Sequence, residues 1–257
     1  MSTFLQSIQS DLIKTKRSSA FWLSLIGSAF IPVIFFLMYT FKPEPFLKNL
    51  GNSPWFVHYN QGWQSLSAFL LPMFVILTSS LIMQIEYKNN TWKQVFASPQ
   101  PLAHVFFSKM ISIHGMILFC IFLFNLFMVV NAVLVNLFND KFTFFQHPFP
   151  FLAILKMSFK TYISILAILA IQYWLSLRLK NFVPPIGIGL GLLITSLILM
   201  QWEHIDKLPY AFPMLTFLKA KPEGNEFILR HEYYSIAYFV VLTGLALWDL
   251  NRRKERG

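Results

Sequence analysis

Six apolar stretches run along this chain, and each is long enough to cross the hydrocarbon core of a bilayer, which takes about 20 helical residues. The composition fits that environment, because 56% of the residues are hydrophobic and only 12% are charged, whereas a typical soluble domain has about 25% charged residues. The sequence therefore predicts an all-α integral membrane protein that forms a single transmembrane domain over residues 1–257. The six predicted spans lie near residues 20–41, 66–85, 109–138, 157–177, 182–201 and 233–250.

Basic residues gather at one set of span ends, and this asymmetry predicts the orientation of the chain. Lys14, Lys16 and Arg17 precede the first span, and Arg252 and Arg253 follow the last. Since cytoplasmic loops carry an excess of Lys and Arg, both termini are predicted to be cytoplasmic. The net charge of +10 is spread over these ends rather than concentrated in one patch, so it does not indicate a nucleic-acid partner. The first apolar run exceeds the roughly 7 to 15 residues of a signal h-region, so we expect it to be a retained span.

The predicted spans are poor in residues that could support chemistry or ion coupling. Asp249, at the end of the last span, is their single acidic residue, whereas ion-coupled carriers use intramembrane ionisable groups. Neither an H-E-x-x-H zinc motif nor a G-x-x-x-x-G-K-[ST] phosphate loop occurs in the sequence. The lone Cys120 offers neither a disulfide nor a metal cluster. We therefore expect no catalytic, cofactor-binding or metal site, and any transport energy must come from another polypeptide.

Several polar and small residues inside the spans have both a structural and a functional interpretation. Lys156 and Lys160 share a helix face. We expect both side chains to reach the outer interface. The functional alternative is that they form an outer cationic rim that attracts anionic lipid or peptide groups. Gly187 and Gly191 have the spacing that allows close helix packing, within the chain or, alternatively, in a dimer. The third span carries polar residues that we expect to bond other helices rather than line a substrate path: His114, Asn125, Asn131 and Asn136.

Residues 1–19 predict an amphipathic helix on the inner membrane surface. The alternative is a short polar tail that only satisfies the charge rule. The predicted apolar face consists of Phe4, Leu5, Ile8, Leu12 and Ile13, and the polar face of Gln6, Gln9, Asp11 and Lys14.

The outer loops are rich in aromatic and proline residues. Trp55, Trp63, Trp202, Tyr233 and Tyr234 are typical of an interfacial belt. The loop before the last span contains the apolar run "LPYAFPMLTFL", which is too short to span and predicts a re-entrant or interfacial outer segment.

The cytoplasmic segment between the second and third spans predicts a short, structured helix. Thr91 and Gln94 form a capping-box pattern, so the helix is expected to begin at Thr91. Trp92, Val95 and Phe96 then share one face, and Pro99 ends the helix. An aromatic face of this kind suits docking into a groove on a soluble partner; the alternative is an interfacial helix that lies on lipid.

The stretch "IEYKNNTWKQVFASPQPLAHVFFSKM" resembles the membrane permeases of type-2 ABC exporters. Those permeases have an acid at the end of the second span, a short helix with an early aromatic residue, and a Lys at the start of the third span. The N-terminal "LIKTKRSSAFW" is similar to the lantibiotic-immunity, bacitracin-resistance and sodium-exporter branch. The positions that match the permease pattern are Glu86, Thr91, Trp92, Ser98, Pro99 and Lys109.

This resemblance implies that the chain is an export permease in a bacterial cytoplasmic membrane. A separate ATPase subunit, carrying ATP and magnesium, would dock on a coupling helix near Thr91–Ser98, and residues 1–19 would form an elbow helix. A second copy or a sister permease would complete the pathway for an amphipathic peptide, lipid or drug. Two alternatives remain: a non-transporting immunity or scaffold protein that sequesters a ligand, and an intramembrane enzyme, which the scarcity of ionisable groups disfavours.

Overall fold

The computed structural model describes residues 2–16, 18–50, 53–88, 100–219 and 228–254. These ranges are mostly helical and contain no strand. Six helical segments are long and apolar enough to cross a membrane, so the predicted fold class is confirmed. They are Ser19–Phe41, Pro54–Tyr87, Leu102–Phe138, Phe151–Arg178, Val183–Gln201 and Arg230–Arg252.

The helices follow one another along the chain with short connections. The α-helices are α1 (Ser2–Lys16), α2 (Ser19–Phe41), α3 (Pro43–Leu50), α4 (Pro54–Ser65), α5 (Leu71–Lys88), α7 (Leu102–Phe138), α8 (Phe151–Ser164), α9 (Leu166–Arg178), α10 (Val183–Ile198), α11 (Phe212–Lys219) and α12 (Arg230–Lys254). The π turn η1 (Leu66–Leu70) joins α4 to α5, and the 3₁₀ turns are η2 (Phe144–Gln146), η3 (Leu199–Gln201), η4 (Ile205–Lys207) and η5 (Pro209–Ala211).

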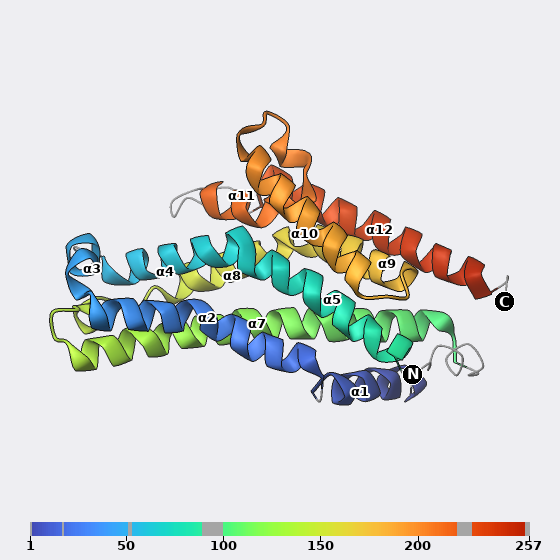
Figure 1. Cartoon of the computed structure of the whole chain (residues 1–257), viewed down its shortest axis with the longest axis horizontal. Coiled ribbons are helices and arrows are strands. Elements are labelled where there is room, and N and C mark those ends of the chain that lie inside the picture. The colour runs from blue at the N-terminus through green and yellow to red at the C-terminus, as the bar shows by residue number, and fades with distance from the viewer. Residues whose placement is uncertain (1, 17, 51–52, 89–99, 220–227, 255–257) are drawn as a thin grey trace.

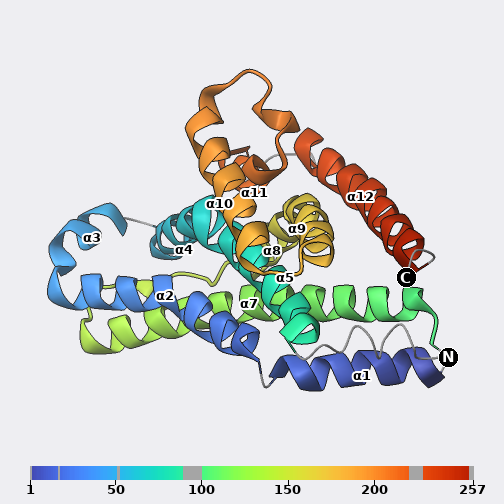
Figure 2. The same cartoon turned by 45° about the vertical axis from the view of Figure 1, so that its right-hand side comes forward.

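Helix α5 lies at the centre of the bundle and packs on α2, α7, α9 and α10. On one side of it, α2 lies along α7; on the other, α9 lies along α12 (Figure 1). Figure 2 shows α12 beside α9 and well away from α2. The two ends of the chain, the end of α5 and the start of α7 lie at the same end of the bundle (Figure 1), which we call the inner end. The opposite end is called the outer end.

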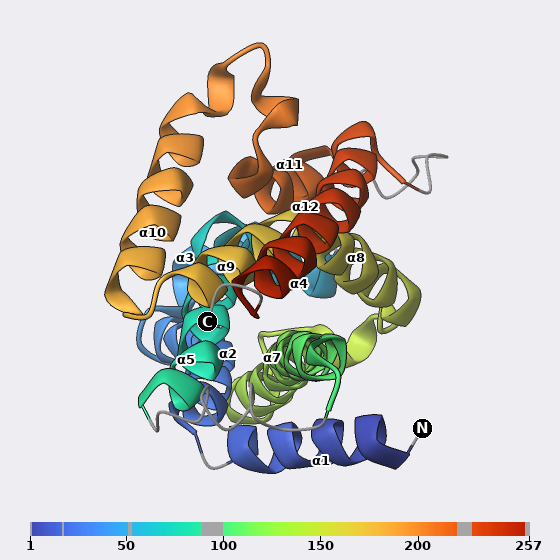
Figure 3. The same cartoon turned by 90° about the vertical axis from the view of Figure 1, so that its right-hand side faces the viewer.

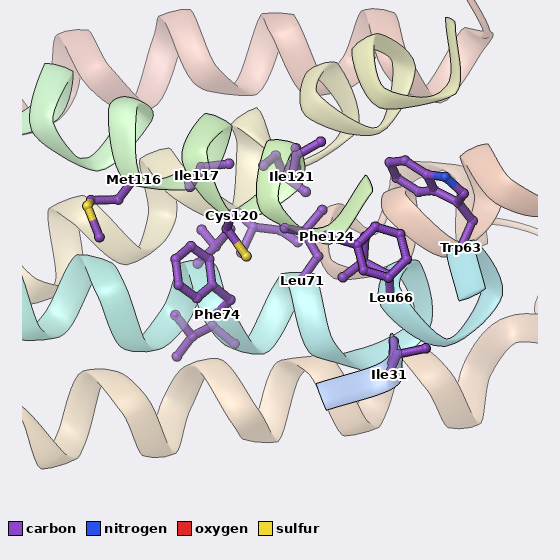
Figure 4. Packing of buried hydrophobic residues seen from close by; sticks show 14 of the residues in the cluster. Ile31, Trp63, Leu66, Leu71, Phe74, Met116, Ile117, Cys120, Ile121 and Phe124 are labelled. Carbon is purple, nitrogen blue, oxygen red and sulfur yellow. The ribbon is translucent and has the colours of Figure 1, made fainter. Parts of the chain in front are cut away.

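The seam between the second span and α7 is filled with apolar side chains. Leu66, Leu71 and Phe74 lie opposite Cys120 and Phe124 of α7 (Figure 4), and all five are buried. In a bilayer, lipid tails are as apolar as these side chains, so close packing rather than removal from water stabilises the contact.

The second span is longer at its outer end than its hydropathy predicts. Its helix begins at Pro54, where the missing N–H of proline costs little, and it continues through η1 into α5. The expectation that Trp55 and Trp63 lie in an interfacial belt is wrong, because this extra helix packs both indoles inside the bundle. The Nε1 atom of Trp55 donates a hydrogen bond to the carbonyl of Phe144, 3.0 Å away.

The backbone has two further irregularities, a break in the fourth span and a helix that lies across the bundle. The fourth span is broken at Ile165, between α8 and α9. Helix α1 lies across the inner end of the bundle: in Figure 3, α7 is seen nearly end-on, whereas α1 runs across the view.

Candidate functional site

The predicted docking helix falls on residues 89–99, which lie outside the described residues, so Thr91, Trp92, Val95, Phe96, Ser98 and Pro99 are not placed. The structure describes both flanks of this segment. Helix α5 ends at Lys88, and α7 begins at Leu102, directly after Pro101.

A cluster of four charged residues lies between these flanks, and we call it the inner charge cluster: Asp11, Lys14, Glu86 and Lys109. Lys109 Nζ lies 2.8 Å from Glu86 Oε1 and 3.2 Å from Asp11 Oδ1. Lys14 Nζ lies 3.0 Å from the same Glu86 oxygen. The hydroxyl of Ser108 donates to Asp11 Oδ2 at 2.6 Å. One cluster thus joins α1, the end of α5 and the start of α7.

Two of the residues in these ion pairs are almost fully buried, so breaking a pair at the inner end is costly. The side chains of Lys109 and Glu86 are only 4% and 2% exposed, whereas Lys14 lies at the rim with 45% exposure. Among the described residues, two cations face two anions in this cluster. Removing one partner of a buried pair leaves the other charge uncompensated, which costs about 3–5 kcal/mol. The cluster therefore favours one fixed arrangement of the three helices.

Helix α1 also contacts the chain just after the undescribed segment. Ser7 Oγ donates to Gln100 Oε1 at 3.1 Å, and the rings of Phe4 and His104 lie 5.3 Å apart. Since Lys14 bonds Glu86 on the other flank, α1 braces both ends of segment 89–99.

The face of α1 that packs on the protein differs from the predicted apolar face. Asp11, expected on the polar and solvated side, is buried against α7. Asp11 is buried because Ser108 and Lys109 supply partners for a carboxylate, which a hydrophobic pattern cannot show. Leu5, Leu12 and Ile13 belong to the face that is expected to lie on the membrane, and they are exposed on the protein. Asp11 is the only acid before Glu44, and this isolation is the sequence signal that could have identified it.

The remaining residues of the predicted elbow fall on both sides of α1. Phe4 and Ile8 are half-buried toward the bundle, Lys16 is exposed, and Arg17 lies outside the described residues.

Comparison with known families identifies the fold that carries this cluster. The family model described as "ABC-2 family transporter protein" matches residues 7–196, which is most of the chain. The chain belongs to the ABC-2 transporter family. The match includes all four residues of the inner charge cluster. Searches of curated proteins and of solved structures gave no match. The permease is accordingly a multi-pass membrane component of a transporter.

The glycine pair of the fifth span faces away from the rest of this ABC-2 permease. A Cβ atom added at Gly187 or Gly191 would meet nothing within 4 Å. The close approach within the chain occurs instead at Gly189, where a Cβ would collide with the side chain of Gln172 and lie 2.9 Å from Ile76 Cγ2. Packing within the chain therefore uses Gly189, on the opposite side of α10 from the predicted pair.

The two lysines of the fourth span do not share one environment. Lys156 is half-buried, whereas Lys160 is buried and lies 3.3 Å from Glu232 on α12. The expectation that both side chains reach the outer interface is wrong for Lys160, because Glu232 supplies an anion inside the bundle.

Three polar side chains of α7, those of His114, Asn125 and Asn131, bond neighbouring helices of the permease as predicted, whereas Asn136 bonds the turn after its own helix. His114 Nδ1 lies 2.8 Å from the hydroxyl of Tyr162. Asn125 donates to Ser158 on α8 at 3.1 Å, and Asn131 donates to the carbonyl of Pro32 on α2 at 2.6 Å. Asn136 Oδ1 accepts from the backbone N–H of Phe144 at 2.8 Å. Within the described residues, no three His, Cys, Asp or Glu side chains are grouped so as to hold a metal ion.

Proposed function

We propose that this permease forms half of the translocation pathway of an ATP-driven exporter, and that a separate ATPase subunit docks on segment 89–99. The coupling helix would present Trp92, Val95 and Phe96 to the ATPase, which would bind ATP and magnesium. The inner charge cluster is the observation that supports this proposal. It joins three helices beside the one cytoplasmic segment whose sequence predicts a docking helix.

The cluster provides a physical route for movement from the ATPase to the spans. A push on segment 89–99 reaches α5 through Glu86, α7 through Lys109 and α1 through Asp11, because ion pairs join these residues. Helix α5 is packed on four other helices, so its displacement moves most of the bundle. Each of the four charges of the cluster has an ion-pair partner, so the cluster can move as a unit.

The orientation follows from the same end of the molecule. Leu5, Leu12 and Ile13 are exposed on α1 beside Lys14 and Lys16, and this combination suits a helix that lies on an anionic inner leaflet. Both ends of the chain lie at this inner end (Figure 1). We therefore place both termini in the cytoplasm and the permease in a bacterial cytoplasmic membrane, with α1 as the elbow helix and residues 208–218 as the re-entrant outer segment.

A second permease, either the same chain or a sister chain, would complete the pathway. The outward faces of Gly187 and Gly191 on α10 leave room for another helix to approach closely. This geometry favours the dimer interpretation of the glycine pair over packing within the chain.

An amphipathic peptide, lipid or drug is the substrate class that agrees best with the spans. The buried charges of the described spans occur in two ion-paired groups, Glu86 with Lys109 and Lys160 with Glu232. Apolar side chains cover most of the remaining helix surface.

Purification of the tagged chain from its native membrane in mild detergent tests the proposal. We expect a P-loop ATPase to be recovered in stoichiometric amount and to be lost from the Trp92→Ala, Phe96→Ala double variant. The matched control is Trp202→Ala with Phe145→Ala, because both side chains are exposed and lie outside the cytoplasmic segment. The control should retain the ATPase.

Recovery of the chain alone, under conditions that preserve other membrane complexes, would favour a non-transporting protein that sequesters a ligand. An ATPase retained equally by both double variants would place the docking surface elsewhere.

A further inference from the structure

The break in the fourth span is closed by one hydroxyl group from the last span. Ser235 on α12 donates to the carbonyls of Ile163, at 2.7 Å, and Ser164, at 3.1 Å. The same hydroxyl accepts from the backbone N–H of Ala167 at 3.1 Å. Backbone groups freed by a break inside a membrane need partners from neighbouring helices. Ser235 supplies them on both sides of Ile165.

One turn further toward the outer end, α12 holds α8 a second time through a buried ion pair. Lys160 Nζ lies 3.3 Å from Glu232 Oε2, and the two side chains are 4% and 0% exposed. Glu232 also accepts from the backbone N–H of Leu229 at 2.7 Å and from the hydroxyl of Thr216 on α11 at 3.2 Å. The charge of Lys160 is thus compensated by a residue that is itself bonded to α11.

Helix α11 contacts both irregular points of the bundle. It packs on the π turn η1 of the second span and on α8 of the fourth span. Phe212 and Leu215 of α11 form, together with Ala167, a small apolar cluster distinct from the main core. Since π turns and broken helices are the places where a span can bend, α11 lies between two bending points.

We propose that Lys160, Thr216, Glu232 and Ser235 form a latch that holds the fourth span straight across its break. When the latch opens, α8 tilts about Ile165 and water from the outer end reaches the break, while α9 keeps its packing on α5 and α12. A buried ion pair is weak evidence for stability, but it is well suited to a two-state contact. Hydration of the separated charges stabilises the open state, and mutual attraction stabilises the closed one. Three of the four residues lie beyond the region that matches the family, residues 7–196.

Cysteine accessibility in the full chain tests the latch without reference to transport. The single native cysteine, Cys120, is first replaced by Ala. Ser164→Cys then reports on the break, and Ser176→Cys, in the inner half of the same span, is the matched control. Both serines are buried, with 0% and 2% exposure, and both replacements are close to isosteric. The probe is a charged methanethiosulfonate added to nanodisc-embedded protein, where it reaches both faces of the bilayer but does not enter the hydrocarbon.

Opening of the latch should raise labelling at the break alone. We expect Lys160→Met to increase the labelling rate of Ser164→Cys about tenfold, which corresponds to about 1.4 kcal/mol, and to leave Ser176→Cys unchanged. Lys156→Met, four residues away and half-buried, should alter neither rate. The exchanged pair Lys160→Glu with Glu232→Lys should restore most of the protection.

Two outcomes would overturn the latch. One is a labelling rate of Ser164→Cys that does not change when Lys160 is replaced. The other is an equal rise in the labelling rates of Ser164→Cys and Ser176→Cys, which indicates general loosening of the span. If Lys160→Met does not assemble, the milder Thr216→Val is tested instead, and the labelling rates of the same two cysteines are compared. It removes the hydroxyl between Glu232 and His231, which lie 3.2 Å and 2.8 Å from it, and it preserves the charge pair.

Discussion

Lys109 Nζ and Glu86 Oε1 lie 2.8 Å apart in a buried ion pair that joins the start of α7 to the end of α5. The two residues flank the segment that we propose as the docking site of the ATPase. Their contact therefore fixes the two helix ends between which that segment runs.

Replacement of Lys109 by Met should destabilise the inner end strongly. Two carboxylates, Asp11 and Glu86, would lose their shared cation, which costs about 3–5 kcal/mol. We expect a lower midpoint of thermal unfolding in detergent and loss of the bound ATPase. Lys109→Arg should retain most of both, since a guanidinium can still reach both acids. Lys156→Met is the control, because the described part of the chain places no acid within ion-pair distance of Lys156. An unchanged midpoint in Lys109→Met would show that the cluster does not stabilise the inner end.

Replacement of Asp11 by Asn should loosen α1 without unfolding the bundle. The amide still accepts from Ser108, but the attraction to Lys109 is lost, at a cost of about 1–3 kcal/mol. Hydrogen–deuterium exchange over residues 2–16 should become faster, while exchange in α7 beyond its first turns stays as in the native chain. The double variant Asp11→Asn with Lys14→Gln should lose still more of the protection, because it also removes the ion pair between Lys14 and Glu86. Native exchange rates in Asp11→Asn would contradict the bracing role of α1.

Alanine at two neighbouring glycines of α10 should have opposite effects. Gly189→Ala forces a collision with Gln172 and Ile76 and should destabilise the permease by about 1–3 kcal/mol. Gly191→Ala meets open space, so it should be neutral or stabilise the helix by about 0.5–1 kcal/mol. Unfolding in graded detergent mixtures measures both. Equal destabilisation by the two substitutions would show that the outward face of α10 is occupied within the chain.

A bulky residue on the outward face of α10 should impair assembly rather than folding. We expect Gly191→Leu to retain the unfolding midpoint of the monomer and to weaken association with a second permease, because a leucine keeps two helices apart. Chemical crosslinking in native membranes, with the exposed Val183→Leu as control, reports on the association. Undiminished crosslinking would place the dimer contact on another helix.

Replacement of Asn131 by Leu should weaken the contact between α7 and α2. The Asn131 amide donates to the Pro32 carbonyl at 2.6 Å, and hydrogen bonds between helices in membranes contribute on average about 0.6 kcal/mol and at most about 1.7 kcal/mol. A small drop in stability within that range is expected in an SDS unfolding titration. A drop of several kcal/mol would indicate that Asn131 has a further role in the core.

The six spans could be predicted from the sequence because the thickness of the hydrocarbon core sets a minimum length for an apolar helix. Hydropathy is averaged over a window of residues, and this is why it missed α4. Asn60, Gln61 and Gln64 lower the mean hydropathy of α4, although the other face of the helix is buried. The same averaging placed Trp55 and Trp63 at an interface, when tertiary packing holds them inside.

The candidate site was predicted only in part, because an ion pair depends on partners far apart in the sequence. The resemblance to type-2 permeases indicated both Glu86 and Lys109, but neither their contact nor Asp11 could be read from it. Lys160 was assigned to the outer interface because its partner Glu232 lies 72 residues later. At Gly189 the sequence shows the same residue as at Gly187 and Gly191, and only its closeness to Gln172 and Ile76 in the fold distinguishes it.

The π turn Leu66–Leu70 sets the rotation between the two halves of the second span. One extra residue in a helix rotates everything beyond it by about 100°, since an α-helix has 3.6 residues per turn. The outer half of the second span can thereby direct Tyr59 and Trp63 toward α7 and Trp55 toward Phe144, while the inner half is buried on nearly every side. A deletion of a single residue here would turn these aromatic rings toward lipid and leave all downstream contacts intact. The length of this turn thus sets how the outer half of the span faces the rest of the bundle.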